Sequence, residues 1–399
     1  MKPRPVASGG DTPQALNAAG FRLLEGGDAA GAVPLFARAA ALDPGAGALW
    51  LNLAKAQRAL GDDAGEAASV ARVLAIDARD LTGLIRFAEL HERRGELARA
   101  TVAWSGVIAV APPLDECAPP LAEVVRHATA FVNTRNADFA ATIEAALTDD
   151  LAEVPPAARR RIDAAIGVAT GRRRVYVNEC AGLHFPFLPA DEFFARDHFP
   201  WIAALEAQAP AIRAEVEALL AGPAEGIVPY VAMEPGAPPN KWSALDRSLN
   251  WSSYYLWQYG APIDAALAKC PATAAALAAI PRAELPGRAP TAFFSILRPH
   301  TRIPPHTGVS NTRAIVHLPL IVPPGCGFRV GGETRAWVEG EAFAFDDTIE
   351  HEAWNDGEEV RVVLILDVCN PYLTSAEQLL LQAFYRAADA SGHNPEPGD

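Results

Sequence analysis

The feature of this sequence that most constrains its fold is a period of 34 residues near the N-terminus. Gly27, Gly61 and Gly95 lie 34 residues apart, and each precedes an acidic residue. Larger residues and the ends of the units keep the same spacing: Phe36, Val70 and Trp104, then Pro44, Ala78 and Pro112. Within a unit, small and apolar side chains recur every three or four residues, which predicts two paired helices. A fixed period of this length indicates stacked units, because each unit buries its apolar face against its neighbours.

The unit resembles the tetratricopeptide repeat. The likeness rests on the turn glycine, on the proline that ends a unit, and on a small residue five positions after the glycine. That residue is Ala32 in the first unit and Ala100 in the third, whereas Glu66 departs from the pattern. The resemblance implies an all-α solenoid of three repeats over residues 12–112. Such a stack either binds a partner peptide on its concave surface or only stabilises the neighbouring domain, and the sequence leaves both roles open.

Length, charge and cysteine usage exclude several classes of protein. The chain has 399 residues, more than the ~250–300 that one core usually accommodates, so we expect more than one domain. Its formal charge of −14 gives nucleic acids no general attraction, and no stretch of ~18 apolar residues predicts a membrane span. The five cysteines are scattered without a CxxC spacing, which favours reduced thiols. We therefore expect a cytoplasmic protein without a nucleic-acid partner.

The pattern changes twice after the repeats. Residues 113–175 open with two proline pairs and continue with alanine-rich helical patterns, which predicts a helical connector. Beyond residue 285, short β-branched and aromatic runs alternate with turn residues; these runs are 292–297, 313–322, 327–330, 334–338, 342–345 and 360–368. Such spacing predicts an all-β sandwich or barrel, and jelly-roll barrels keep an open mouth lined by side chains. The whole chain is thus expected to be an α+β multidomain protein.

The β-rich region contains four of the nine histidines within 52 residues: His300, His306, His317 and His351. His306 and His351 each fall at an expected strand end. They are 45 positions apart, too far for a two-histidine site on one helix, and this spacing fits two strands that a barrel brings together. A single histidine is more often structural than functional. The ordered set, with an arginine following, favours a metal site.

That arginine is Arg361, which lies ten residues after His351 and opens an apolar run. An arginine that points into an aliphatic barrel requires an anion, because the guanidinium keeps its charge and its forked donors fit a carboxylate. The order of H-x-G, then His, then Arg is what ferrous iron and a dicarboxylate co-substrate need.

Several segments closely resemble the aspartyl/asparaginyl β-hydroxylase family of iron(II)- and 2-oxoglutarate-dependent oxygenases. They are SILRP at 295–299, PHTG at 305–308, NTR at 311–313, HL at 317–318, ETRAW at 333–337, FDDTIEHEAW at 345–354 and Arg361. The likeness covers about residues 180–375. It implies a double-stranded β-helix, jelly-roll or cupin-like, over residues 176–385. Some members of the family carry tetratricopeptide repeats before the catalytic domain, and this chain has the same order.

The resemblance also implies roles for individual residues. The iron ligands fall on His306 and His351, and Gly308 stands where most related oxygenases have a third, carboxylate ligand. The contacts to 2-oxoglutarate, which is consumed together with O2, fall on Ser295, His317 and Arg361. Asp346 and Asp347 are neighbours on an expected strand, so at most one faces the metal, and the resemblance assigns neither as a ligand.

The substrate side departs from the family. Arg313 matches one of two arginines that contact the substrate carboxylate, but the position of the second is Ile315. Trp251 follows polar residues at the start of an expected strand, and we expect it at the substrate rim. The leading expectation is hydroxylation of an Asp-type or Asn-type side chain, in a peptide or a small molecule with a carboxylate or amide. The alternatives are oxidation of a lipid-linked or free carboxylate metabolite, and a non-catalytic scaffold that binds partners through the repeats.

Overall fold

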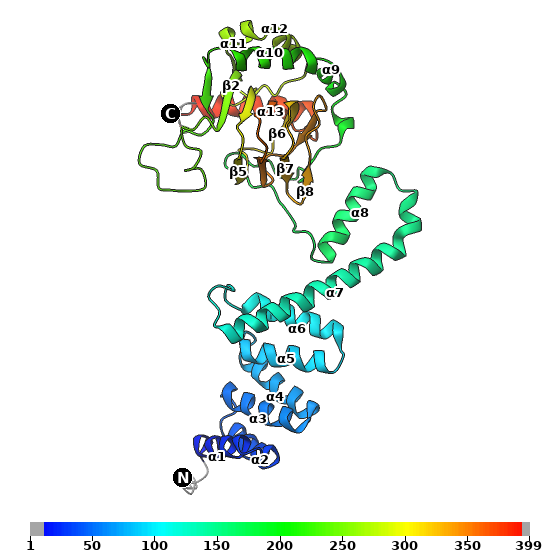
Figure 1. The fold of residues 1–399 in the computed structure, drawn as a ribbon, viewed down its shortest axis with the longest axis vertical. Helices are drawn as coiled ribbons and strands as arrows, with labels where there is room; N and C mark the ends of the chain where they lie inside the picture. The colour runs from blue at the N-terminus through cyan, green and yellow to red at the C-terminus, as the bar shows by residue number, and fades with distance from the viewer. Residues whose placement is uncertain (1–11, 393–399) are drawn as a thin grey trace. The chain divides into compact units, whose positions relative to one another are not determined.

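The structure is a computed structural model that describes residues 12–392. The chain divides between Arg172 and Arg173 into two compact units, which Figure 1 shows as a helical part and a part built around β-sheets. Within the described residues, no helix is both long and apolar enough to cross a membrane.

The first unit begins with six helices, which pack in consecutive pairs. They are α1 (Pro13–Glu25), α2 (Ala29–Leu42), α3 (Gly47–Leu60), α4 (Asp63–Ile76), α5 (Leu81–Arg93) and α6 (Leu97–Val110). Gly27, Gly61 and Gly95 link the two helices of each pair and have φ values of 87°, 73° and 67°. This left-handed conformation favours glycine, which explains the period. The predicted tetratricopeptide-like repeats are confirmed.

The residues that share the 34-residue spacing form the core of the repeats. Phe36 and Val70 are fully buried, and Trp104 is nearly so. Gly20 on α1 permits the close approach of α2, because a Cβ at this position would lie 2.8 Å from the ring of Phe36. The size pattern in the sequence therefore encodes how closely the paired helices pack.

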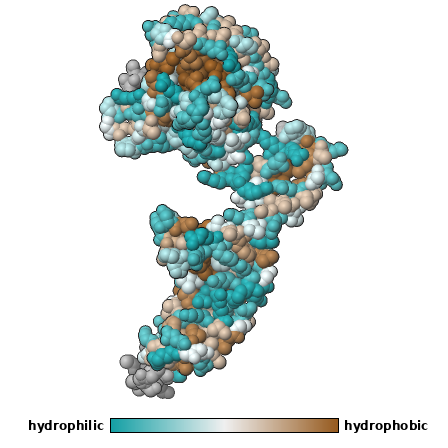
Figure 2. Space-filling model, in the orientation of Figure 1, coloured by the Kyte–Doolittle hydropathy of each residue, from teal (hydrophilic) through white to brown (hydrophobic). Residues whose placement is uncertain are grey.

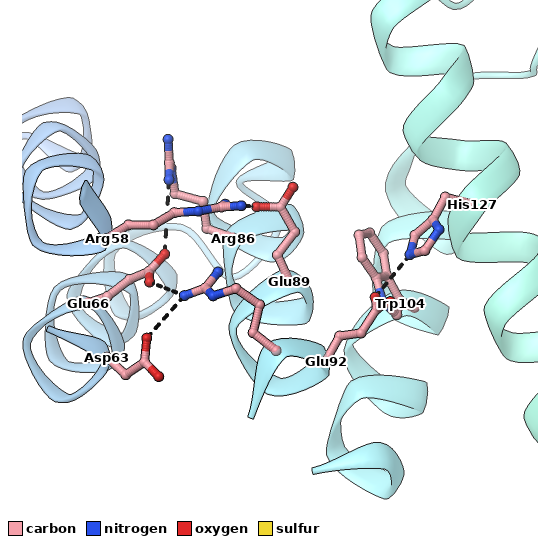
Figure 3. Close-up of polar contacts among 9 residues, drawn as sticks. Arg58, Asp63, Glu66, Arg86, Glu89, Glu92, Trp104 and His127 are labelled. Atoms are coloured by element: carbon pink, nitrogen blue, oxygen red, sulfur yellow. Dashed lines mark hydrogen bonds and ion pairs between the residues drawn. The ribbon is translucent and has the colours of Figure 1, made fainter. Parts of the chain in front are cut away.

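Glu66, the departure from the small-residue pattern, is fully buried on α4 and contacts two arginines of α5. Its Oε2 accepts a hydrogen bond from Arg93 at 2.5 Å, and its Oε1 lies 4.0 Å from Arg86 (Figure 3). Arg93 also contacts Asp63, at 3.2 Å. A buried carboxylate needs such partners. The second repeat thus replaces a small core residue with ion pairs to the third repeat.

Two further helices follow, α7 (Pro119–Ala152) and α8 (Pro156–Ala169). Glu92 of α5 joins the last repeat to α7, since its Oε2 accepts hydrogen bonds from Trp104 Nε1 at 2.7 Å and from His127 Nε2 at 2.9 Å (Figure 3). Residues 113–175, which we expected to be a connector, contain these two helices. Both helices group with the first unit and do not form a unit of their own.

The second unit contains two antiparallel sheets. The larger has the order β1 (Ile227–Pro229), β2 (Trp251–Gln258), β4 (Ala292–Leu297), β11 (Arg361–Cys369), β6 (Arg313–Ile321) and β9 (Phe343–Phe345), with β3 (Ala261–Pro262) beside β2. The smaller has the order β5 (Thr301–His306), β10 (His351–Asn355), β7 (Cys326–Val330) and β8 (Glu333–Arg335). The β-rich region expected beyond residue 285 is confirmed, and the structure shows that its sheets are antiparallel.

Opposite faces of the larger sheet belong to different cores. One face packs against helices; it includes Leu256, Phe294 and Leu364, which share a cluster with helical residues such as Ile212. The helices are α9 (Ile202–Glu206), α10 (Ala209–Ala221), α11 (Asp264–Lys269) and α12 (Pro271–Ala278). The short helix η1 (Arg196–His198) precedes them and buries none of its residues. The other face includes Val363, which packs with residues of the smaller sheet. Alternation along β11 therefore directs Arg361 and Val363 to the space between the sheets.

The last helix, α13 (Ser375–Ala390), begins with a capping box in which Thr374 and Glu377 bond each other's backbone N–H groups. Its inner side buries Leu381 and Tyr385. Its outer side leaves Leu379, Leu380 and Phe384 exposed by 64%, 68% and 52%. Figure 2 shows hydrophobic residues gathering on the face that α13 crosses in Figure 1.

Candidate active site

Strand pairing brings the two predicted metal-binding histidines together. β10 lies antiparallel to β5, and the register places His351 directly opposite His306. The centroids of the two imidazole rings are 4.1 Å apart. The separation of 45 residues in sequence is thus closed by a single strand pair.

Backbone carbonyls determine the tautomer of both rings. The Nδ1 of His306 lies 2.8 Å from the carbonyl oxygen of Pro304, and the Nδ1 of His351 lies 3.0 Å from that of Ile349. Because a carbonyl oxygen only accepts hydrogen bonds, each Nδ1 carries a proton, and each Nε2 keeps a free lone pair. Burial lowers the pKa of His306 to about 4 and lowers the pKa of His351 well below its ordinary value. Both rings are neutral at pH 7, which is the form that binds metals.

Gly308, in the loop after β5, has no side chain, and the carboxylate of Asp347 lies where its Cβ would be. A Cβ added to Gly308 would overlap the Oδ2 of Asp347. The Oδ1 of Asp347 is buried without a hydrogen-bond partner in the described part of the chain, and burial raises the pKa of this carboxyl to about 7. Asp346, in contrast, accepts hydrogen bonds from Asn178 and Thr348. The two aspartates therefore have different surroundings, and only Asp347 lies against the position of the missing ligand.

Arg361 is a buried cation beside this site, at the first residue of β11. It is 2% exposed, and its Nη1 donates to the Oγ of Ser295 at 3.1 Å and to the carbonyl oxygen of Ser295 at 3.3 Å. Its Nε has no partner, and no carboxylate pairs with it among residues 12–392. Burial lowers its pKa to about 10. A buried guanidinium without an anion identifies a place for an anionic ligand.

Trp337 connects Arg361 to His317. Its ring centroid lies 4.6 Å from the Cζ of Arg361, and its Nε1 donates to the Nδ1 of His317 at 3.3 Å. Burial lowers the pKa of His317 well below its ordinary value, and the charge of Arg361 lowers it further. Contacts through Arg361 and Trp337 therefore link Ser295, Arg361 and His317, the three residues that the resemblance assigned to the co-substrate. We had not singled out Trp337, because its role depends on a contact between β11 and the loop after β8.

Arg313 and Trp251, the two residues expected to contact the substrate, both donate hydrogen bonds to other side chains of the protein. The Nη1 of Arg313 donates to the Oδ2 of Asp367 at 2.6 Å, and both side chains are largely buried. Trp251 is 5% exposed, and its Nε1 donates to the Oγ of Ser295 at 3.2 Å. The exposed aromatic residue here is Tyr230, whose ring stacks on Trp251 at 3.9 Å. Sequence reasoning did not find Tyr230, which lies in a segment without any motif.

The comparisons with known proteins agree with this arrangement. Residues 206–371 match the family model described as aspartyl/asparaginyl beta-hydroxylase. The predicted family resemblance is confirmed. In the described residues, no group of three or more histidine, cysteine, aspartate or glutamate side chains is placed to hold a metal, so the histidine pair of this hydroxylase-like domain lacks a third protein ligand.

Two curated relatives and one solved structure illustrate the range of similarity. The chain is 40% identical over 136 residues to the mouse (Mus musculus) aspartyl/asparaginyl beta-hydroxylase, which covers 34% of this chain and 18% of that protein. It is 34% identical over 181 residues to the ornithine lipid ester-linked acyl 2-hydroxylase of Rhizobium tropici, covering 45% and 60%. The Sgt2 TPR domain from Aspergillus fumigatus aligns with a TM-score of 0.28 and 14% identity, covering 31% of this chain and 81% of that domain. The chain thus spans less than two thirds of both curated relatives.

Proposed function

We propose that this protein is an iron(II)- and 2-oxoglutarate-dependent dioxygenase whose two sheets form a double-stranded β-helix. The observation that carries the proposal is the placement of two neutral histidines, with free Nε2 atoms, in the same inter-sheet space as a buried arginine without an anion. The names of both curated relatives, which are hydroxylases, support it. The third alternative, a non-catalytic scaffold, does not require this set of residues.

The donor set fits a ferrous ion. Imidazole nitrogen is a suitable ligand for iron, and His306 and His351 present two such nitrogens from opposed strands. When bound, iron supplies the oxygen activation that the reaction needs. The carbonyl oxygens of Pro304 and Ile349 hold each ring in the tautomer that binds metal. The unpartnered Oδ1 of Asp347 is an acceptor for a donor such as water at the position that Gly308 leaves without a ligand.

The co-substrate site follows from Arg361. Its guanidinium would bind the distal carboxylate of 2-oxoglutarate, with the hydroxyl of Ser295 and the imidazole of His317 beside it. The aromatic rings of Trp337 and Phe328 exclude water from this side. In the reaction, 2-oxoglutarate and O2 give succinate and carbon dioxide, and the second oxygen atom enters a C–H bond of the substrate as hydroxyl. The residues of the chain hold the two reactants in a site from which water is excluded.

Two substrate classes remain proposals. The first is an Asp-type or Asn-type side chain, in keeping with the matched family. The second is an acyl group of a lipid, in keeping with the name of the Rhizobium relative. One observation favours the second: Arg313 already pairs with Asp367, and Ile315 replaces the other arginine that the resemblance led us to expect. Binding of a protein partner by the repeats and a cytoplasmic location stay predictions.

Substitution of the histidines tests the proposed function. We expect His306→Ala and His351→Ala each to abolish iron-dependent release of succinate from 2-oxoglutarate, because each removes a metal ligand. His300→Ala is the matched control, since this histidine is 63% exposed and pairs with Glu358. Succinate is measured after anaerobic reconstitution with ferrous iron and addition of oxygen, and circular dichroism checks that each variant folds. Near-native turnover in either His306→Ala or His351→Ala would remove that residue from the metal site.

A further inference from the structure

Tyr230 lies directly after β1, and its backbone N–H donates to the carbonyl oxygen of Trp251 on β2 at 3.0 Å. Its ring stacks on that of Trp251 with a centroid distance of 3.9 Å and an interplanar angle of 21°. Tyr230 is 40% exposed, yet packing around its hydroxyl raises the pKa of that group above its ordinary value through desolvation. The ring of Tyr230 is therefore packed on Trp251 and is still accessible to solvent.

The rings of Tyr230, Trp251 and Trp242 form a continuous stack, which we call the aromatic wall. The rings of Trp242 and Trp251 are 6.0 Å apart with an interplanar angle of 30°, and the ring of Trp242 lies 5.1 Å from that of His306. The Nε1 of Trp251 is already bonded to Ser295, so this part of the wall offers no free donor to a substrate. The parts of the wall that a substrate can contact are the exposed ring of Tyr230 and the partly exposed ring of Trp242, and the buried ring of Trp251 joins them.

A cation lies at one edge of the aromatic wall. The Nζ of Lys241 donates to the carbonyl oxygen of Pro305, the residue before His306, at 2.9 Å. It also lies 5.5 Å from the ring centroid of Trp242. Across the part of the chain that the structure describes, no carboxylate pairs with Lys241. Its positive charge is thus positioned by the backbone and is available to an anion.

The other two cations near the site are not available in this way. Arg313 pairs with Asp367, and Arg361 lies on the co-substrate side of the site. A substrate that brings a carboxylate next to its reacting carbon therefore meets no unpaired cation at Arg313. A substrate with an aliphatic chain meets the aromatic wall, and its charged end meets Lys241.

We propose that the substrate is an amphiphile with a single aliphatic chain, which packs on the aromatic wall, and an anionic group, which pairs with Lys241. Tyr230 and Lys241 are then positioning residues. The inference rests on the proposed function and names the substrate class of that site. The step is the one stated for the dioxygenase: a C–H bond of the chain becomes C–OH with one atom of O2, while 2-oxoglutarate is oxidised to succinate and carbon dioxide with the other.

The first test compares the binding of three probes to the complex of the protein with iron and 2-oxoglutarate. Each probe is titrated anaerobically, and tryptophan fluorescence detects its binding. The probes are dodecanoate, 1-dodecanol, which has the same chain without the charge, and the blocked tripeptide acetyl-Ala-Asp-Ala-amide. We expect dodecanoate to bind about fivefold more tightly than dodecanol, as for a partly exposed ion pair, and the peptide to bind most weakly. Equal binding of dodecanoate and dodecanol, or tightest binding of the peptide, overturns the inference.

Variants test the two residues separately. Lys241→Gln should abolish the preference for dodecanoate over dodecanol and Lys241→Arg should keep it, whereas Lys269→Gln, a change at an exposed lysine, should have no effect. Tyr230→Ala should weaken both probes about tenfold, and Tyr230→Phe should not, because the ring provides the contact. An unchanged preference in Lys241→Gln, or native binding in Tyr230→Ala, also contradicts the inference. The charge-transfer band of the iron and 2-oxoglutarate complex is recorded first, and its absence from the wild-type protein would refute the proposed function and not the substrate class.

Discussion

Replacing Asp347 with asparagine should stabilise the metal-free protein at pH 8 much more than at pH 5. Burial raises the pKa of this carboxyl from its ordinary value of 3.8 to about 7 in the folded protein. The positive charge of Arg313 lowers the pKa, but it offsets only part of the effect of burial. Between these two values the folded state keeps a proton that the unfolded state loses. Stability therefore falls as the pH rises through this window, and the full penalty is present above pH 7.

The size of the effect follows from the two pKa values. Each pH unit between the two pKa values lowers the free energy of unfolding by about 1.36 kcal/mol. The rise of the pKa from 3.8 to about 7 therefore destabilises the folded protein by about 4 kcal/mol at pH 8 and by about 1.5 kcal/mol at pH 5. Asparagine is nearly the same size and cannot ionise, so the variant avoids this penalty. The free energy of unfolding of Asp347→Asn should exceed that of the wild type by amounts of this order.

Urea unfolding in the presence of a chelator measures the difference at both pH values. Tryptophan fluorescence reports mainly on the second unit, which holds six of the eight tryptophans. Asp356→Asn is the control, because it is the same substitution at a carboxylate that is 45% exposed. A gap between Asp347→Asn and the wild type that is the same at pH 5 and pH 8 would refute the reasoning.

Three further changes test other contacts. Gly308→Ala should lower the free energy of unfolding in urea by about 1–3 kcal/mol, because the added Cβ overlaps Asp347. The double variant with Asp347→Ala should recover this loss. If the single variant loses no stability, the packing of Asp347 against Gly308 is wrong. Arg361→Ala should weaken 2-oxoglutarate binding by roughly 30-fold or more in an anaerobic titration, and Arg361→Lys should weaken it less. If Arg361→Ala binds 2-oxoglutarate with the affinity of the wild type, the co-substrate binds elsewhere. Glu66→Ala should lower the free energy of unfolding, measured by circular dichroism in urea, by about 1–3 kcal/mol, a range that allows for the partial exposure of Arg93. Glu66→Gln should lower it less. Equal stability of both variants and the wild type would show that the ion pairs contribute nothing.

The helical repeats were predictable because their signal is local. A turn glycine, a small residue and a large apolar residue recur at one period, and the structure places Gly27 in the left-handed region and Phe36 in the core. The ion pairs of Glu66 were not predictable, since they depend on which side chains of the next repeat lie opposite it.

The strands were predictable where their composition was typical of strands. β4, β6 and β11 match apolar runs in the sequence. β5 contains two adjacent prolines, and the five residues of β10, HEAWN, do not alternate between polar and apolar types, so neither segment has a strong strand signal of its own. Both become strands because they pair with each other, and β10 also pairs with β7.

The sequence alone determined the residues with chemical potential: His306, His351 and Arg361 appear in it in an order that already predicts a metal and a carboxylate ligand. Only the tertiary structure decided what surrounds them. It pairs Arg313 with Asp367, and it places Tyr230 on Trp251 beside the histidines. The physical reason is the range of the interactions. Helix periodicity and turn geometry act between residues a few positions apart, whereas strand register and the partner of a buried charge depend on packing between segments that are distant in the chain.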